Sequence, residues 1–424
     1  MWTKFIRGLL SEKTDRYVFN RCSRDDKDYS NCRAIDLYVH IPFCKGSCRY
    51  CPYITQPFDL NSSKLYRDAL VSELGHYADL LKDKPVGSLY IGGGTPTLDL
   101  SLVGDLLKHL RQIVTPSGPI AIETTPSDIS CSKIDELKKL GIDYISLGVQ
   151  SFNPGYLALL GRNYEAEDAG KALSELMESG LSLVNADMIF AFPGQTLREF
   201  MEDLGKLMQW SPHQVTCYPL FTFPYSSVGR FMRLKRLKMP DVFVRRKMYY
   251  EMTGYFQKCG YKQTSVWSFT KNENRHNYSS VTRDHYLGLG VGAGSYTGKG
   301  FYFNTFSTKE YMDKAAYRRP TAIKMDITER MEKLFWLYWR FYETEINAVR
   351  YHSRFNNGID EDFGRMLWTV EKMGMLRLDG ARSRILNERG AFWIHLLQNY
   401  FALNYVNRVW TAGLADPWPE RIRL

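Results

Sequence analysis

Short runs rich in β-branched and aromatic residues alternate with longer helical patterns from residue 35 onward, and this alternation constrains the fold more than any other feature. The predicted strands cover residues 36–40, 86–91, 119–123, 143–149, 183–190 and 214–219. Helical periodicity fills the intervals at 64–81, 101–114, 132–140, 167–179 and 197–208. Such alternation is typical of βα units around a parallel sheet. Six units predict an α/β fold, an incomplete barrel with an open side.

Changes in this pattern divide the chain into four parts. They are an N-terminal extension (1–34), the partial barrel (35–235), an α/β extension that closes the barrel (236–325) and a C-terminal lobe (326–424). The third part contains a glycine-rich turn at 287–294. The last part is mainly helical and aromatic, with helices expected near 331–341 and 390–409, and this composition predicts a separate lobe.

Eight cysteines in 424 residues are too few for a disulfide framework in a chain that can bury a large core. No apolar stretch reaches the length of a membrane span. We therefore expect a cytoplasmic protein from a reducing compartment. Five of the cysteines are scattered and are interpreted as mostly structural or buried thiols, namely Cys22, Cys32, Cys131, Cys217 and Cys259.

The net charge of +10 permits attraction to anionic partners but does not locate a site. The densest basic run covers residues 230–238. A solvated helix or loop face is the simpler interpretation of this run, and a binding patch is the alternative. We expect no nucleic-acid partner, whereas a small substrate that carries carboxylates would benefit from the same charge.

Cys44, Cys48 and Cys51 have the spacing C-x3-C-x2-C, which brings three thiolates together without an obvious fourth. An iron–sulfur cluster used only for electron transfer normally has four protein ligands. Three cysteines therefore suggest a 4Fe–4S cluster with one iron free for another ligand.

Polar residues stand at the ends of successive predicted strands. Since the carboxyl ends of parallel strands form the active face of such a barrel, these residues are expected to converge. They are His40, the run Gly92–Thr97, Glu123, Gln150, Asp187 and Tyr218.

The three glycines at 92–94 let backbone groups approach a polar ligand closely, although a tight turn is the alternative interpretation. Beside a cysteine loop, this run is a candidate for holding a charged amino-acid moiety. Glu123 and Asp187 could bind an ammonium group or ribose hydroxyls, and Arg162 could pair with a carboxylate. Each of the three could equally form an ordinary ion pair.

Five motifs in order resemble those of radical S-adenosylmethionine (SAM) enzymes. They are the cysteine loop at 38–51, YIGGGTPT at 90–97, LGVQSF at 147–152, LGR at 160–162 and DMIFAFPGQT at 187–196. Within that superfamily, residues 33–300 are similar to the branch of oxygen-independent coproporphyrinogen III oxidase, the haem chaperone HemW, anaerobic haem-opening enzymes and class C methyltransferases. The resemblance implies a partial (β/α)6 radical SAM barrel, here followed by the mainly helical C-terminal lobe.

The resemblance also implies roles for named residues. Cys44, Cys48 and Cys51 would ligate the 4Fe–4S cluster, whose open iron binds the amino and carboxylate groups of SAM. An electron from a reductase such as flavodoxin or ferredoxin would then split SAM into methionine and a 5′-deoxyadenosyl radical. Gly93, Gly94 and Thr95 would bind the methionine end of SAM. Other SAM contacts would come from Glu123, Gln150, Arg162 and Asp187. Tyr38 would lie near the cluster. A buried strand tyrosine is an equal alternative for Tyr38, and Phe43, Tyr50 and Tyr53 are either an aromatic shield or core.

Departures from the branch pattern guide the choice of activity. Tyr53 stands where the oxidase carries a further cysteine, which argues against decarboxylation. His276 and Asn277 match the start of the HemW haem motif, but the aromatic pair of that motif is missing, so haem ligation is weakened without being excluded. Aromatic residues at 217–225 and 264–269 would form a flat apolar pocket for a planar substrate, or else belong to the core.

We therefore predict a class C-like methyltransferase that uses two SAM molecules to methylate an sp2 carbon of a planar or conjugated substrate. Two alternatives stay open. One is a HemW-like haem chaperone, and the other is an anaerobic tetrapyrrole enzyme that decarboxylates a porphyrinogen or opens haem.

Overall fold

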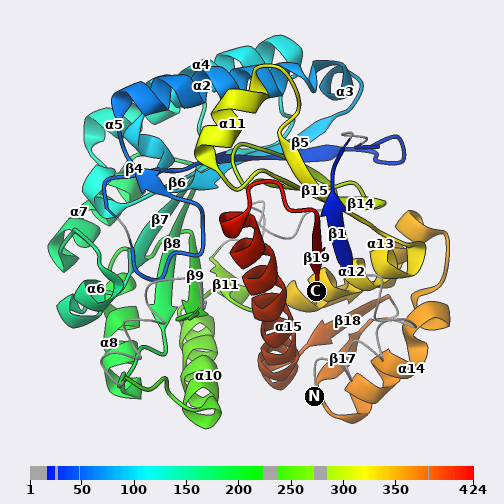
Figure 1. The fold of residues 1–424 in the computed structure, drawn as a ribbon. Coiled ribbons are helices and arrows are strands. Elements are labelled where there is room, and N and C mark those ends of the chain that lie inside the picture. The colour runs from blue at the N-terminus through cyan, green and yellow to red at the C-terminus, as the bar shows by residue number, and fades with distance from the viewer. Residues whose placement is uncertain (1–16, 24–26, 47, 223–236, 272–283, 381) are drawn as a thin grey trace.

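The computed structural model describes residues 17–23, 27–46, 48–222, 237–271, 284–380 and 382–424. Among these residues the strands form one mixed sheet of 14 strands, with a 3-stranded and a 2-stranded sheet beside it (Figure 1). The large sheet has the order β10-β11-β9-β8-β7-β6-β5-β2-β12-β13-β14-β15-β1-β19. Its central part is parallel and curves around an interior, so the predicted α/β partial barrel is confirmed.

The six predicted strands are all present within a few residues of their expected ends. They are β2 (Ile35–Ile41), β5 (Val86–Gly93), β6 (Ile120–Thr124), β7 (Tyr144–Gln150), β8 (Leu183–Phe190) and β9 (Gln214–Pro219). Each pairs in parallel with the next along the chain. A further strand, β12 (Tyr286–Leu289), pairs in parallel with β2 on its other side. The parallel part of the sheet is therefore one strand wider than the sequence predicts.

Helices on the outer face connect these strands. They are α2 (Leu60–Gly75), α3 (Ala78–Lys82), α4 (Leu100–Ile113), α5 (Cys131–Lys139), α6 (Pro154–Leu160), α7 (Ala166–Glu178), α8 (Leu197–Leu207) and α10 (Val242–Lys258). The single helix predicted over 64–81 is in fact two, because α2 ends at Gly75, a poor helix former. Side chains fix several starts. The Asp59 carboxylate caps α2 through Ser62 N–H, and Thr196 and Glu199 form a capping box on α8.

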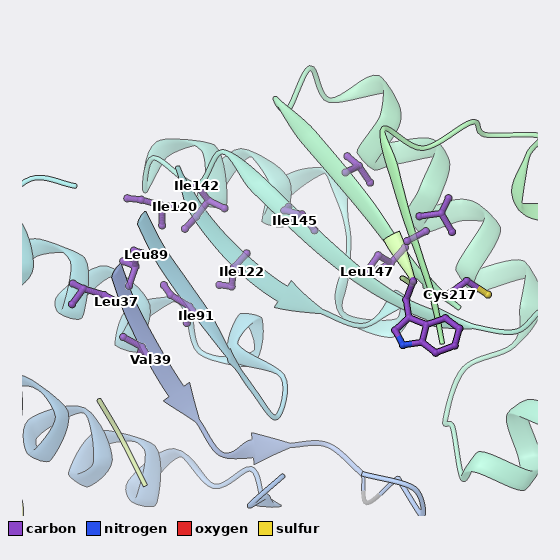
Figure 2. Packing of buried hydrophobic residues seen from close by; sticks show 14 of the residues in the cluster. Leu37, Val39, Leu89, Ile91, Ile120, Ile122, Ile142, Ile145, Leu147 and Cys217 are labelled. Atoms are coloured by element: carbon purple, nitrogen blue, oxygen red, sulfur yellow. The ribbon is translucent and has the colours of Figure 1, made fainter. Parts of the chain in front are cut away.

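Alternate residues of the parallel strands point outward into an apolar layer beneath the helices. Leu37 and Val39 of β2, Leu89 and Ile91 of β5 and Ile122 of β6 belong to this layer (Figure 2). The residues between them point inward, and several of these carry polar groups. Because a strand alternates its two faces, the same segments build both the core and the lining of the barrel interior.

Antiparallel strands extend the sheet at both ends. Next to β9 lie β11 (Ser268–Thr270) and β10 (Lys262–Gln263). Beyond β12 lie β13 (Gly294–Tyr296), β14 (Gly300–Asn304), β15 (Thr321–Asp326), β1 (Val18–Arg21) and β19 (Arg421–Arg423). The N-terminal extension and the C-terminal part thus each contribute a strand to the barrel sheet. No pairing among the described residues joins the end strands β10 and β19, so the barrel stays open.

The C-terminal part is mainly helical, as predicted. After α11 (Thr308–Ala315) it contains α12 (Glu329–Tyr342), β16 (Glu345–Asn347), α13 (Ala348–Phe355), α14 (Ile359–Lys372), β17 (Leu376–Asp379), β18 (Ser383–Leu386) and α15 (Glu388–Ala415). The long helix α15 contacts α10 near one end of the sheet and β19 at the other (Figure 1). It therefore crosses the open side. Within the described residues, no helix is long and apolar enough to span a membrane.

Candidate active site at the carboxyl ends of the strands

The cysteine loop follows β2 directly. Cys44 lies in the short strand β3 (Phe43–Cys44), which pairs with β4 (Gln56–Pro57), and the N–H of Cys51 donates to the carbonyl of Cys48 at 3.3 Å. All three cysteines are half-buried free thiols. Burial raises the pKa of Cys44 to about 11 and that of Cys51 to about 12. These thiols therefore keep their protons until a metal displaces them.

The donor set of this loop, three free cysteine thiols, fits a 4Fe–4S cluster. In a cluster each cysteine binds a different iron, and three thiols leave one iron open. The Thr95 hydroxyl donates to Cys44 Sγ at 3.9 Å, which supports one of the ligand positions.

The glycine run after β5 packs directly against the cysteine loop. Gly94 N–H donates to Ile41 O and Thr95 N–H donates to Phe43 O, each at 2.8 Å. A Cβ on Gly94 would lie 2.5 Å from Phe43 O, and Gly93 has a φ of +117°. Larger residues would force the two loops apart, so these glycines allow close packing on the cysteine loop. Their close approach to a polar ligand stays a prediction.

Glu123 at the end of β6 receives two hydrogen bonds from β5. The Tyr90 hydroxyl donates to one carboxylate oxygen, and Gly93 N–H donates to the other at 3.0 Å. Burial raises the pKa of Glu123 to about 7, and the nearby Asp187 carboxylate adds to the rise. Tyr90 begins the motif at 90–97, but the sequence predicts no contact for its hydroxyl; its place on the inward face of β5 is the usable signal.

Asp187 on β8 is held by two neutral donors. The Ser146 hydroxyl donates to one carboxylate oxygen at 2.8 Å, and the Asn185 amide donates to the other at 2.9 Å. Burial raises the pKa of Asp187 to about 6. Ser146 and Asn185 were also missed from sequence, because a buried Ser or Asn in a strand has no distinctive pattern.

Gln150 ends β7 in a left-handed conformation, with φ of +67°. Such strain in a non-glycine residue needs support from its surroundings. Asp203 of α8 supplies it, because its carboxylate accepts hydrogen bonds from the Ser151 hydroxyl and, at 3.1 Å, from Phe152 N–H. The Tyr218 hydroxyl donates to the Gln150 side-chain oxygen at 3.3 Å.

Arg162 follows α6 and is enclosed by aromatic side chains. Its guanidinium lies 5.4 Å from the centre of the Tyr50 ring and 5.6 Å from that of Tyr164, and it donates to the Tyr50 hydroxyl. Burial by itself would lower the pKa of Arg162, but the surrounding tyrosines and Cys48 hold it well above its ordinary value, so the group stays charged. Its Nε is buried and has no hydrogen-bond partner among the described residues. A buried donor of this kind is available to a further acceptor, such as a bound ligand.

Tyr38 lies inside the barrel beside His40. The carbonyl of Ile54 can only accept, so the His40 Nε2–H donates to it at 2.8 Å and Nδ1 accepts from the Tyr38 hydroxyl at 3.0 Å. Burial lowers the pKa of His40 to about 4, and the imidazole is neutral. Both of its nitrogens are occupied, so His40 fixes the loop and is not free as a metal ligand.

Comparison with known proteins places this chain in a family. The model of the radical SAM superfamily matches residues 38–207. The chain is 26% identical to the haem chaperone HemW of Bacillus subtilis, over 80% of this chain and 92% of that protein. It is 30% identical to HemW of Buchnera aphidicola from Schizaphis graminum, over 61% of this chain and 69% of that protein. This chain belongs to the radical SAM superfamily. Its place is in the HemW and coproporphyrinogen oxidase branch.

Two further likenesses are to coproporphyrinogen III oxidases. Oxygen-independent coproporphyrinogen III oxidase of Salmonella typhimurium is 27% identical over 68% of this chain and 66% of its own length. The structure of the Escherichia coli coproporphyrinogen III oxidase HemN superposes with a TM-score of 0.74 at 23% identity, covering 87% of this chain and 89% of that one. The latter supports the fold alone.

Radical SAM proteins use a 4Fe–4S cluster and SAM, and these are the cofactors of this chain. The relatives above carry the names haem chaperone and coproporphyrinogen oxidase, so they do not support the predicted methyl transfer. That activity and the second SAM molecule stay predictions.

The radical SAM site does not include all the aromatic residues expected to form a flat pocket. Trp267 and Phe269 are buried in the core, where Trp267 packs 5.8 Å from Phe190 on the outer side of β8. Strand alternation turns them away from the interior, so for these two the core alternative is correct. Tyr218 and Phe221 do stack in parallel at 6.1 Å.

Other predictions have mixed outcomes. Phe43 is core, Tyr50 contacts Arg162, and Tyr53 is half-exposed. Among the scattered cysteines, Cys32 and Cys217 are buried but Cys131 is exposed, because it begins α5 on the surface. His276, Asn277, residues 223–225 and residues 230–236 lie outside the described residues.

Proposed function

We propose that this chain is a radical SAM protein of the haem chaperone type, which binds SAM at the cysteine loop and haem as its cargo. The observation that carries the SAM site is the charged, half-buried Arg162, whose buried Nε has no partner among the described residues, on the same face as the cysteine loop, Glu123 and Asp187. A carboxylate such as that of methionine is a matching acceptor.

Cys44, Cys48 and Cys51 would hold the cluster. When bound, the reduced cluster supplies the electron that cleaves SAM. The contribution of the chain itself is to bind and orient SAM and to exclude water. Arg162 would bind a carboxylate, and Tyr50 and Tyr164 shield this pair from solvent.

The glycine run would offer acceptors to the methionine end of SAM. The N–H groups of Gly93, Gly94 and Thr95 already donate within the chain, to Glu123, Ile41 and Phe43. Contacts from this run to an ammonium group would therefore use carbonyl oxygens. Glu123 and Asp187 would add negative charge near the cationic part of SAM, and Gln150 would add a polar contact at the end of β7.

Two observations support haem as the cargo. HemW proteins from Bacillus subtilis and Buchnera aphidicola match this chain over much of its length. In addition, Tyr53 stands where the resemblance places a further cysteine in the oxidase, so a decarboxylating site lacks one of its groups.

The proposal predicts SAM cleavage without turnover of a porphyrinogen. Protein reconstituted anaerobically with iron and sulfide should bind haem stoichiometrically, seen as a shifted Soret band. With a chemical reductant, or with reduced flavodoxin as the proposed electron donor, it should form 5′-deoxyadenosine. Formation of protoporphyrinogen from coproporphyrinogen, or of a methylated product, would contradict the chaperone assignment.

A matched pair of cysteine variants separates the cluster from general thiol effects. Cys48→Ala should abolish cluster absorbance and 5′-deoxyadenosine formation together. Cys131→Ala, at an exposed position on α5, should leave both unchanged. Equal losses in both variants would argue against the cluster assignment.

A further inference from the structure

The interior of the barrel contains two neighbouring layers of polar side chains next to the candidate SAM site. Residues that pair directly across strands point to the same face of the sheet. The pairing of β7, β8, β9 and β11 therefore defines a lower layer of Ser146, Asn185, Gln214 and Thr270, and an upper layer that includes Asp187, Thr216 and Ser268.

Asn185 connects the two layers at Asp187. Its Nδ2 donates to the Asp187 carboxylate at 2.9 Å and to the Ser146 hydroxyl oxygen at 2.8 Å. Ser146 in turn donates to the other Asp187 oxygen at 2.8 Å. Both oxygens of this carboxylate are thus held by a small ring of hydrogen bonds centred on one amide.

The oxygen of the Asn185 side-chain amide also has two hydrogen-bond partners. It accepts from the Thr216 hydroxyl at 2.9 Å and from the Gln214 amide at 3.2 Å. Asn185 is fully buried and uses two donors and two acceptor positions. Reversing the amide would place its oxygen against the Asp187 carboxylate and its N–H groups against donors, so one orientation is fixed.

The row continues to β11, the neighbour of the end strand β10. The Thr270 hydroxyl of β11 donates to the side-chain oxygen Oε1 of Gln214 at 3.2 Å. The same hydroxyl lies 3.2 Å from the Thr264 hydroxyl. Within the described residues, no Lys or Arg forms an ion pair with Asp187. The hydrogen bonds that orient it come from neutral groups, and the row behind them reaches β11, the second strand from the end of the sheet.

We propose that Asn185 is a positioning residue for SAM binding, which aims the Asp187 carboxylate at the cofactor through its fixed amide. This inference rests on the proposed function, in which Asp187 contacts SAM. Without the amide donor, the carboxylate loses one of its two restraints and can rotate away from the ligand.

Asn185→Asp tests the proposal, since it replaces the donating amide by an acceptor of the same shape. SAM affinity of cluster-reconstituted protein is measured by equilibrium dialysis at pH 8 and pH 6. At pH 8 two carboxylates would face each other, and the dissociation constant should rise at least tenfold relative to the unsubstituted protein. At pH 6 one shared proton restores a donor between the two groups, so the loss should shrink to a few-fold.

Asn304→Asp is the matched control. Asn304 is also buried, and its side chain donates to the buried Glu73 carboxylate at 2.7 Å. It lies on β14, which is separated from β8 by several strands in the sheet. This variant should lower the melting temperature, but its SAM dissociation constant should keep the same ratio between pH 8 and pH 6 as that of the unsubstituted protein. An equal pH-dependent loss in both variants would make the effect one of general destabilisation and would overturn the proposal.

Thr216→Val provides a second test if Asn185→Asp fails to fold. It removes one donor to the Asn185 carbonyl without touching Asp187, and SAM binding should weaken about threefold while cluster absorbance is retained. Unchanged SAM affinity in folded Asn185→Asp and Thr216→Val proteins would overturn the proposed role of Asn185 and leave the proposed function standing. Absence of SAM binding by the unsubstituted protein would instead overturn the proposed function.

Discussion

At the scale of single residues, the half-buried carboxyls of Glu123 and Asp187 share the barrel interior with the half-buried guanidinium of Arg162. Burial raises the pKa of Glu123 to about 7 and that of Asp187 to about 6. A bound cation stabilises the ionised form of such groups, so the free site carries protons that SAM binding would release.

This linkage predicts a pH dependence of SAM affinity. Below pH 6 both carboxyls are mostly protonated and binding must displace the protons, whereas at pH 8 both are ionised. The dissociation constant should therefore fall about tenfold between pH 5.5 and pH 8, because a shift of one pKa unit corresponds to about 1.4 kcal/mol. Isothermal titration calorimetry in buffers of different ionisation enthalpy measures both the affinity and the protons released.

Glu123→Gln is the control for this dependence. It should weaken binding at pH 8 and flatten the pH profile, leaving the part that belongs to Asp187. A profile that is already flat in the unsubstituted protein would show that neither carboxyl contacts the cationic part of SAM.

At the scale of elements, the turn from β7 to α6 is held by a residue of a different helix. Asp203 of α8 accepts hydrogen bonds from Ser151 and Phe152, next to the strained Gln150. Asp203 is only 3% exposed, and it holds the turn beside the left-handed Gln150. The packing of α8 is therefore coupled to the position of Gln150, a candidate SAM contact.

We expect Asp203→Ala to lower the free energy of unfolding by about 1–3 kcal/mol, since it leaves the Phe152 N–H buried without its partner. SAM affinity should also fall, because Gln150 can then relax. Urea denaturation and equilibrium dialysis measure the two effects. Glu202→Ala, on the exposed side of the same helix and paired with Arg198 at 2.8 Å, should change neither. Similar effects of both changes would show that α8 acts merely through its overall stability.

At the scale of the whole molecule, the two ends of the described chain pair with each other in one sheet. β1 lies between β15 and β19, and the side chain of Ile422 is buried against Phe19 in a second apolar cluster. The C-terminal strand therefore covers what would be an exposed sheet edge.

Ile422→Ala should lower the free energy of unfolding by about 2–4 kcal/mol, the usual cost of removing a buried aliphatic side chain. Arg421→Ala, at the neighbouring exposed position of β19, should change it by less than about 0.5 kcal/mol. Thermal denaturation of both variants measures the difference. Equal stability would mean that the ends of the sheet contribute nothing to the fold.

The sequence by itself determined the parallel part of the barrel except for β12, and it determined the cofactors of the chain. Strand alternation and βα order are local patterns, and β8 and β9 begin and end at the predicted residues. The spacing of Cys44, Cys48 and Cys51 and the order of five motifs were enough to place the chain in the radical SAM superfamily.

Only the tertiary structure decided which groups support that site. Three contacts support it: Asn185 with Asp187, Tyr90 with Glu123, and Asp203 with Ser151. The partners are 2, 33 and 52 positions apart in the chain, so a local sequence pattern could indicate only the first. The pairing of β1 with β19 joins residues about as far apart as the chain allows. Sequence patterns report periodicity along one segment, whereas hydrogen bonds between strands and helices depend on register and layer, which exist only once the sheet has formed.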